Sequence, residues 1–140
     1  MSGKNLKQQY RRLLEDNFPA TMEISFGEDS FKQTLRFEKV TWNIGNEEKG
    51  LRYGENPHQP AALYRLINGN LALGDVQAVS PESRLVSDAQ LKKSGKHPGM
   101  INITDVDSAL NILRYFPYRP TTVIIKHNNP CGVAQRSDLS

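Results

Sequence analysis

Two adjacent ionisable residues, Lys126 and His127, follow a β-branched run at positions 123–125. Such a run is typical of a buried strand, so the pair is expected at the rim of a sheet, where open α/β sheets bind ligands. A histidine can serve as a general base, and a neighbouring ammonium can stabilise an oxyanion. Both side chains reach one ligand only if the chain turns there, as the following Asn-Asn-Pro sequence favours. The alternative is a solvated lysine beside a structural histidine.

A second candidate group, Leu51–Gln59, is dense in glycine, proline and asparagine. Arg52 offers a planar fork that suits phosphate or carboxylate, and Tyr53 offers a stacking surface with a polar tip. Gly54 permits close approach of the backbone to a ligand. The alternative is an ordinary surface loop, because such clusters are usually only turns.

A third group, Gly95–Asn102, places glycine and proline before an expected helix, where anions or amides can bind. Asn102 could pair with the amide of a ligand through its own amide. Lys96 and His97 repeat the Lys-His pair, but no strand positions them. We therefore interpret them as solvated loop residues.

The sequence does not indicate a metal site. His58, His97 and His127 are far apart, and Cys131 is the single cysteine, so the usual zinc spacings are absent. The Pro-Cys pair ending at Cys131 resembles the start of the Pro-Cys-x-x-Cys motif of zinc deaminases, but Ala134 stands where the second cysteine would be. Cys131 is expected to be a small packed residue.

Length and charge restrict the function classes further. The 140 residues correspond to one domain, and a net charge of +3 from scattered residues suits anionic small molecules. There is no basic stripe with interleaved aromatics, so a nucleic-acid partner is not expected. The sequence contains no apolar run long enough to span a membrane, and its N-terminus is polar, unlike a signal peptide. Both features favour a cytoplasmic location.

Patterns of apolar residues predict the elements around these groups. Helical spacing predicts helices over 4–18 and 105–116, the second capped by Thr104, and a short helix near 88–93. We expect a charged loop over 45–50 and a hairpin turn over 27–30. Alternating or continuous apolar runs predict strands over 21–26, 31–43, 61–67, 71–79 and 121–125. The strand–helix–strand order in the second half predicts an α/β sheet.

The segments Leu51–Gln59 (LRYGENPHQ) and Lys126–Ala134 (KHNNPCGVA) together closely resemble AICAR transformylase. That purine-biosynthesis enzyme transfers a formyl group from 10-formyltetrahydrofolate to the 5-amino group of aminoimidazole carboxamide ribonucleotide (AICAR). Asn102–Leu113 is similar to the family's segment between the two motifs. The resemblance is weaker over the first fifty residues. It implies a cytidine-deaminase-like α/β fold with flanking helices that has lost its zinc chemistry.

The resemblance also implies residue roles. His127 would accept a proton from the substrate amine, and Lys126 would stabilise the developing charge and assist the folate leaving group. Arg52 and Tyr53, followed by Gly54, would hold the nucleotide, with Arg52 near its phosphate. Asn102 would contact the carboxamide.

The same resemblance predicts how the chain is organised. Residues 1–50 would be a helix-and-hairpin lead-in, and residues 51–140 the N-terminal portion of the transformylase domain, without an IMP cyclohydrolase domain. The family's active site forms between subunits, so we expect a homodimer or the remainder of the transformylase as partner, and little activity from this chain alone. The formyl donor is either the folate or, as in some related archaeal enzymes, formate activated by ATP. The alternative function is a non-catalytic nucleotide-binding or assembly module that retains Arg52 and Tyr53.

Overall fold

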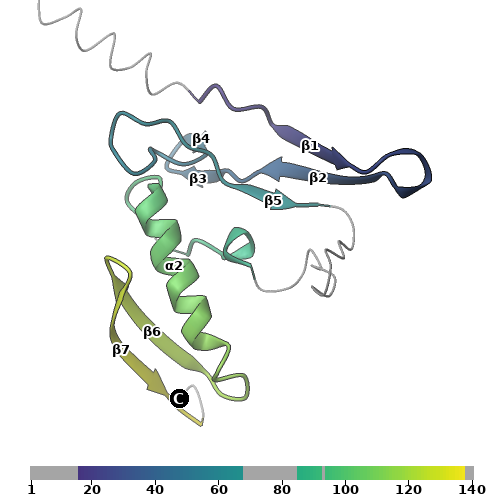
Figure 1. Ribbon diagram of the computed structural model, residues 1–140. Helices are drawn as coiled ribbons and strands as arrows, with labels where there is room; N and C mark the ends of the chain where they lie inside the picture. The colour runs from purple at the N-terminus through teal and green to yellow at the C-terminus, as the bar shows by residue number, and fades with distance from the viewer. Residues whose placement is uncertain (1–15, 68–84, 93, 138–140) are drawn as a thin grey trace, which may run out of the picture.

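The computed structural model describes residues 16–67, 85–92 and 94–137. Their strands form three antiparallel sheets, in the orders β1-β2-β5, β3-β4 and β6-β7, with one α-helix and two 3₁₀ turns (Figure 1). The elements are β1 (Thr21–Phe26), η1 (Asp29–Phe31), β2 (Gln33–Lys39), β3 (Trp42–Ile44), β4 (Glu47–Lys49), β5 (Tyr64–Leu66), η2 (Val86–Asp88), α2 (Met100–Leu113), β6 (Thr121–Lys126) and β7 (Asn129–Gln135).

The first predicted hairpin is confirmed. β1 pairs with β2, Ile24 lies opposite Leu35, and Gly27 adopts a φ of 81° in the connection. The second strand ends earlier than predicted, because the chain leaves this sheet after β2 and enters a separate hairpin of β3 and β4. The prediction of a loop over 45–50 is therefore wrong in part. Gly45 has a φ of 66° at the first position of the two-residue turn, where a type II′ turn needs glycine.

β5 extends the first sheet from a later part of the chain. It pairs with β2, so that Lys39 lies opposite Tyr64. The Tyr64 hydroxyl donates to the carbonyl oxygen of Pro19 at 2.6 Å, and the Lys39 ammonium pairs with Asp16 at 3.0 Å. The sheet thus contains strands from both sides of the expected division after residue 50, and that division stays a prediction.

The helix α2 begins at Met100 rather than at residue 105. Its N-cap is Gly99, whose N–H donates to the side-chain oxygen of Asn102 at 2.9 Å. The Thr104 hydroxyl instead donates to the carbonyl oxygen of Ile101, so the predicted cap at Thr104 is wrong. An asparagine at the third helical position supplies the bond that Glu or Gln makes in a capping box.

β6 confirms the strand predicted over 121–125, and it packs against α2 (Figure 1). It pairs with β7, which the sequence analysis missed, so the two form an antiparallel hairpin after the helix. Ile124 and Val133 remain exposed on this hairpin. The strands of the described ranges pair only in antiparallel fashion, and a cytidine-deaminase-like arrangement stays a prediction.

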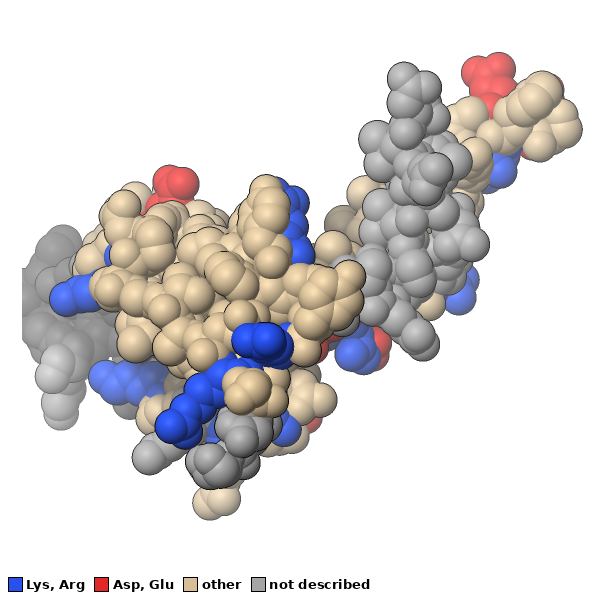
Figure 2. Space-filling model, turned by 90° about the horizontal axis from the view of Figure 1, so that it is seen from below, with Lys and Arg blue, Asp and Glu red and all other residues tan. Residues whose placement is uncertain are grey.

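Other predictions fall partly or wholly outside the described residues. The strand over 71–79 and most of the helix over 4–18 lie outside them, and residues 16–18 are not helical. The short helix predicted near 88–93 is wrong for the described residues 89–92, which are not helical, and only Asp88 lies in a 3₁₀ turn, η2. No helix in the described part of the chain is long and apolar enough to span a bilayer. Figure 2 shows basic side chains scattered over the face that it draws, as expected from their spacing in the sequence.

Candidate functional site

Two of the predicted groups lie side by side. The backbone N–H of Arg52 donates to the carbonyl oxygen of Pro98 at 2.8 Å, and the N–H of Met100 donates to the carbonyl oxygen of Tyr53 at 2.9 Å. These two bonds align the Arg52–Tyr53 segment with the loop that enters α2. The structure therefore brings together residues that are about fifty positions apart in the sequence.

The Tyr53 ring lies against Gly99 and orients Arg52. One guanidinium nitrogen of Arg52 donates to the Tyr53 hydroxyl at 2.6 Å, and the guanidinium carbon lies 4.4 Å from the ring centroid. Gly99 has no side chain to displace the ring, since a Cβ there would lie 2.8 Å from Tyr53 Cε2. Tyr53 is half-buried and Arg52 is exposed, so the fork is held in place yet open to a ligand.

Replacing Gly99 by alanine is expected to destabilise the fold by about 1–3 kcal/mol, the usual effect of overpacking. The backbone at Gly99 (φ −90°, ψ 171°) accepts alanine, so the effect comes from the clash with Tyr53. Gly95→Ala is the matched control, because no atom lies within 4 Å of its added Cβ. The free energies of unfolding in urea compare the two, and equal values would contradict the packing of the ring on Gly99.

Gly54 is buried against its own loop. Its N–H donates to the carbonyl oxygen of Gln59 at 2.7 Å, and an added Cβ would lie 3.4 Å from the Gln59 Cβ. The Gln59 N–H in turn donates to the carbonyl oxygen of Asn56. The small size of Gly54 therefore serves loop packing, and its contact with a ligand stays a prediction.

Asn102 lies on the exposed first turn of α2, next to Gly99 and Tyr53. Its Oδ1 accepts the Gly99 N–H and keeps a second lone pair, and its amide nitrogen can only donate. None of the described residues hydrogen-bonds to that nitrogen. This nitrogen can therefore donate to the carbonyl oxygen of a ligand amide.

Lys126 and His127 lie where the chain turns from β6 into β7. Lys126 is the last residue of β6, and His127 and Asn128 form a two-residue turn with φ values of 51° and 60°. Positive φ at both positions is typical of a type I′ hairpin turn. Asn129 closes the turn, since its side-chain amide donates to the carbonyl oxygen of His127 at 2.9 Å. The predicted turn is confirmed, and both ionisable side chains are exposed at its tip.

The helix α2 holds this turn as well. The N–H of Asn128 donates to the carboxylate of Asp105 at 2.7 Å, and the Ser108 hydroxyl donates to the Asn128 side chain at 3.2 Å. At about 1.5 Å of rise per residue, Asp105 lies roughly 7.5 Å along the helix axis from Met100. One short stretch of α2 therefore contacts both the Arg52–Tyr53 segment and the Lys126–His127 turn. The sequence analysis did not predict that Asp105 and Ser108 hold this turn. Their i, i+3 spacing places both on one face of the helix and was the signal that could have indicated it.

Replacing Asp105 by alanine is expected to release the turn, at a stability cost of about 1 kcal/mol. The loss is modest because Asn128 is exposed and water can replace the carboxylate, but the Asn128 N–H then loses its protection from hydrogen exchange. Amide hydrogen exchange at Asn128 is the direct measurement. Asp107→Ala, an exposed carboxylate on the same helix, is the control, and equal exchange at Asn128 in both variants would contradict the role of Asp105.

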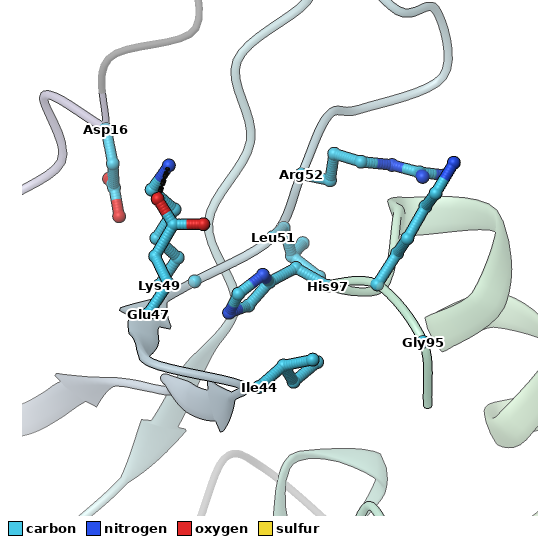
Figure 3. A pocket seen from close by; sticks show the side chains of 10 residues that line it. Asp16, Ile44, Glu47, Lys49, Leu51, Arg52, Gly95 and His97 are labelled. Atoms are coloured by element: carbon cyan, nitrogen blue, oxygen red, sulfur yellow. Dashed lines mark ion pairs between the residues drawn. The ribbon is translucent and has the colours of Figure 1, made fainter. Parts of the chain in front are cut away.

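A pocket of about 350 Å³ lies beside Arg52 (Figure 3). Lys96 and His97 also line it. The His97 ring is half-buried, with Nε2 3.0 Å from the carbonyl oxygen of Trp42, so the prediction of a solvated His97 is wrong, whereas Lys96 is exposed as expected. Lys126 and His127 do not line this pocket.

The carboxyl group of Glu47, which lines the pocket, has a lowered pKa. The Lys49 ammonium hydrogen-bonds to Glu47 and holds the pKa of that carboxyl below its ordinary value. A lowered pKa in the folded state favours the charged form. The Glu47–Lys49 contact therefore adds stability above the ordinary carboxyl pKa, and this contribution is lost as the pH falls through the lowered value.

Cys131 is exposed on β7, so the prediction of a packed cysteine is wrong. The physical reason is that β7 is an edge strand of a two-stranded sheet and all of its residues are exposed. In the described ranges, no three His, Cys, Asp or Glu side chains are grouped as metal ligands would be.

Comparisons with known proteins identify the family. The model of the AICARFT/IMPCHase bienzyme family matches residues 7–140, including most of the first fifty residues. The bifunctional purine biosynthesis protein PurH of Acetivibrio thermocellus is 38% identical over 115 residues, which are 81% of this chain and 18% of the relative. PurH of Streptococcus gordonii is 39% identical over 102 residues (73% and 17%), and PurH of Myxococcus xanthus is 43% identical over 88 residues (63% and 15%).

This chain therefore spans less than a fifth of the length of these relatives. No solved structure matches it significantly. The family model nevertheless covers almost the whole chain, and the relatives share more than a third of its residues over most of its length. The chain belongs to the AICARFT/IMPCHase bienzyme family.

Proposed function

We propose that this chain supplies the nucleotide-binding and proton-transfer residues of a formyltransferase of purine biosynthesis. The reaction moves a formyl group from 10-formyltetrahydrofolate to the 5-amino group of AICAR. Membership of the family supports the general class. The observation that carries the residue roles is that α2 contacts both candidate motifs, through Met100 on Tyr53 and through Asp105 on Asn128.

The chemistry of the proposed reaction needs a base and a positive charge. A bond forms between the substrate amine and the formyl carbon while the bond from that carbon to the folate nitrogen breaks. His127 accepts the proton that the amine loses, and Lys126 stabilises the charge on the formyl oxygen and donates a proton to the leaving folate nitrogen, which departs as a neutral amine. The amine is a poor nucleophile, because its lone pair delocalises into the ring and carboxamide. Positioning and electrostatics must therefore supply most of the rate.

The nucleotide is held at the start of α2 in this proposal. Arg52 presents its fork to the phosphate, in an orientation that the Tyr53 hydroxyl fixes. Asn102 donates its amide N–H, to which none of the described residues hydrogen-bonds, to the carbonyl oxygen of the substrate carboxamide. Gly54 lets the loop after Tyr53 stay compact beside the ligand.

Further parts of the proposal concern the surroundings of the site. We propose a cytidine-deaminase-like fold, a homodimer with the active site between subunits, a cytoplasmic location, and folate contacts from outside the described residues. The chemistry requires no metal. Formate activated by ATP is the alternative formyl donor.

A non-catalytic binding or assembly module is the second candidate. The observation that favours it is the exposure of Lys126, His127 and all of β7 in the described structure. An open hairpin tip excludes no water from a reacting amine, whereas enzymes that transfer reactive groups exclude it. In this case the chain would bind the nucleotide and present its hairpin to a partner.

Two measurements test the proposal. Calorimetry with AICAR shows whether the chain binds the nucleotide. Formyl transfer is then assayed in a chimera, in which this chain replaces the matching segment of the Acetivibrio thermocellus relative. Binding with turnover supports the enzyme, and binding without turnover supports the module. If neither the chain nor the chimera binds AICAR, both the enzyme and the binding module are contradicted.

A further inference from the structure

The pocket beside Arg52 carries charges of both signs. Figure 3 shows the carboxylates of Asp16 and Glu47 on the side opposite to the Arg52 guanidinium. Each carboxylate has a partner, because Asp16 pairs with the Lys39 ammonium at 3.0 Å and Glu47 pairs with Lys49. These four groups neutralise one another at that end of the pocket.

Two cations of the pocket are not neutralised in this way. No carboxylate of the described residues lies within ion-pair distance of Arg52 or Lys96. The partner of the Arg52 guanidinium is the neutral hydroxyl of Tyr53, which occupies one of its donors and leaves the rest of the fork open. The pocket therefore has an excess of positive charge next to Arg52, which favours an anionic ligand.

The chain directly after Lys96 is held in place at two points. His97 Nε2 lies 3.0 Å from the carbonyl oxygen of Trp42, and the carbonyl oxygen of Pro98 accepts the backbone N–H of Arg52 at 2.8 Å. The base of the Lys96 side chain is thus fixed near the Arg52 segment before any ligand arrives. Such preorganisation lowers the entropic cost of binding.

We propose that Lys96 acts with Arg52 to bind a phosphate monoester in this pocket. Arg52 supplies a planar fork and Lys96 a compact point charge, two complementary ways of binding phosphate oxygens. The volume of about 350 Å³ accommodates a phosphate with its sugar. Identification of the ligand as AICAR rests on the proposed function. On that basis, Lys96 determines how strongly the phosphorylated nucleotide is preferred over its riboside.

Calorimetry on the full chain tests this inference with three probes: ribose 5-phosphate, AICAR and the AICAR riboside. Lys96→Met is expected to weaken binding of both phosphorylated probes about tenfold and to leave riboside binding unchanged. Lys96→Arg retains the charge and is expected to bind within about threefold of the unmodified chain. Lys92→Met is the matched control, because Lys92 is an exposed lysine of the same segment that does not line this pocket.

The outcomes separate this inference from the proposed function. The inference is overturned if Lys96→Met binds the phosphorylated probes normally, or if the same variant loses as much affinity for the riboside. It is also overturned if Lys92→Met weakens binding as much as Lys96→Met does, or if the unmodified chain does not bind ribose 5-phosphate. Lys96-dependent binding of ribose 5-phosphate without binding of AICAR sustains the inference and contradicts the proposed function. AICAR binding that is independent of Lys96 overturns the inference and supports the proposed function.

Discussion

Replacement of His127 by alanine is expected to lower the rate of formyl transfer about 10²- to 10⁴-fold, the range of a lost general acid–base group. The substrate amine then loses its proton only to solvent. AICAR affinity is expected to change little, because the nucleotide is held by Arg52 and Tyr53. Activity in the chimera described above, with AICAR binding measured in parallel, gives both values.

The pH profile distinguishes a base from a merely structural histidine. Only neutral imidazole accepts a proton, so the activity of the unmodified protein is expected to fall on the acid side, and His127→Ala is expected to lose this limb. Lys126→Ala is expected to lower the rate by a similar factor, because the developing negative charge loses its partner. Thr122→Ala, an exposed change on the same strand, controls for disturbance of β6. Normal rates in both the His127 and Lys126 variants would contradict the assigned roles.

Replacement of Arg52 by alanine is expected to weaken AICAR binding about 10- to 100-fold, since hydrogen bonds to charged groups contribute about 1.5–3 kcal/mol. Riboside binding is expected to stay the same, because the riboside lacks the phosphate that the fork binds. Tyr53→Phe is expected to have a smaller effect of the same kind, through loss of the hydroxyl that orients the fork.

The matched control for Arg52 is Arg65→Ala. Arg65 is an exposed arginine that pairs with Glu38 on the first sheet, at 2.9 Å, and it does not line the pocket beside Arg52. Calorimetry compares the variants, and Arg52→Lys tests whether charge alone suffices. Equal losses for Arg52→Ala and Arg65→Ala, or an equal loss for the riboside, would contradict phosphate recognition by Arg52.

Local sequence patterns predicted those secondary-structure elements that a stretch of only a few residues is enough to indicate. The β-branched run at 123–125 predicted β6 to within one residue, and the glycine-containing turn at 27–30 predicted the first hairpin. β7 was missed because its own sequence, Asn-Pro-Cys-Gly, is typical of a turn. Pro130 is tolerated there because it lies opposite Ile125, where the register of the two strands shifts.

The start of α2 and the assembly of the site depend on contacts between distant residues. The helix begins at Met100 because Asn102 caps Gly99 and Tyr53 accepts the N–H of Met100, and neither bond is visible in helical periodicity. Similarly, the Lys-His turn could be predicted locally, but its attachment to Asp105 required the fold. The residue types of the candidate site were therefore predictable, whereas the helix that joins its parts was not.

An NMR titration of the chain with AICAR tests most directly whether α2 brings the two motifs to one nucleotide. We predict that the amide signals of residues 52–54 and of residues 126–128 shift together and saturate at the same AICAR concentration. Shifts confined to one of these segments, or saturation at different concentrations, would show that the two motifs do not share a ligand.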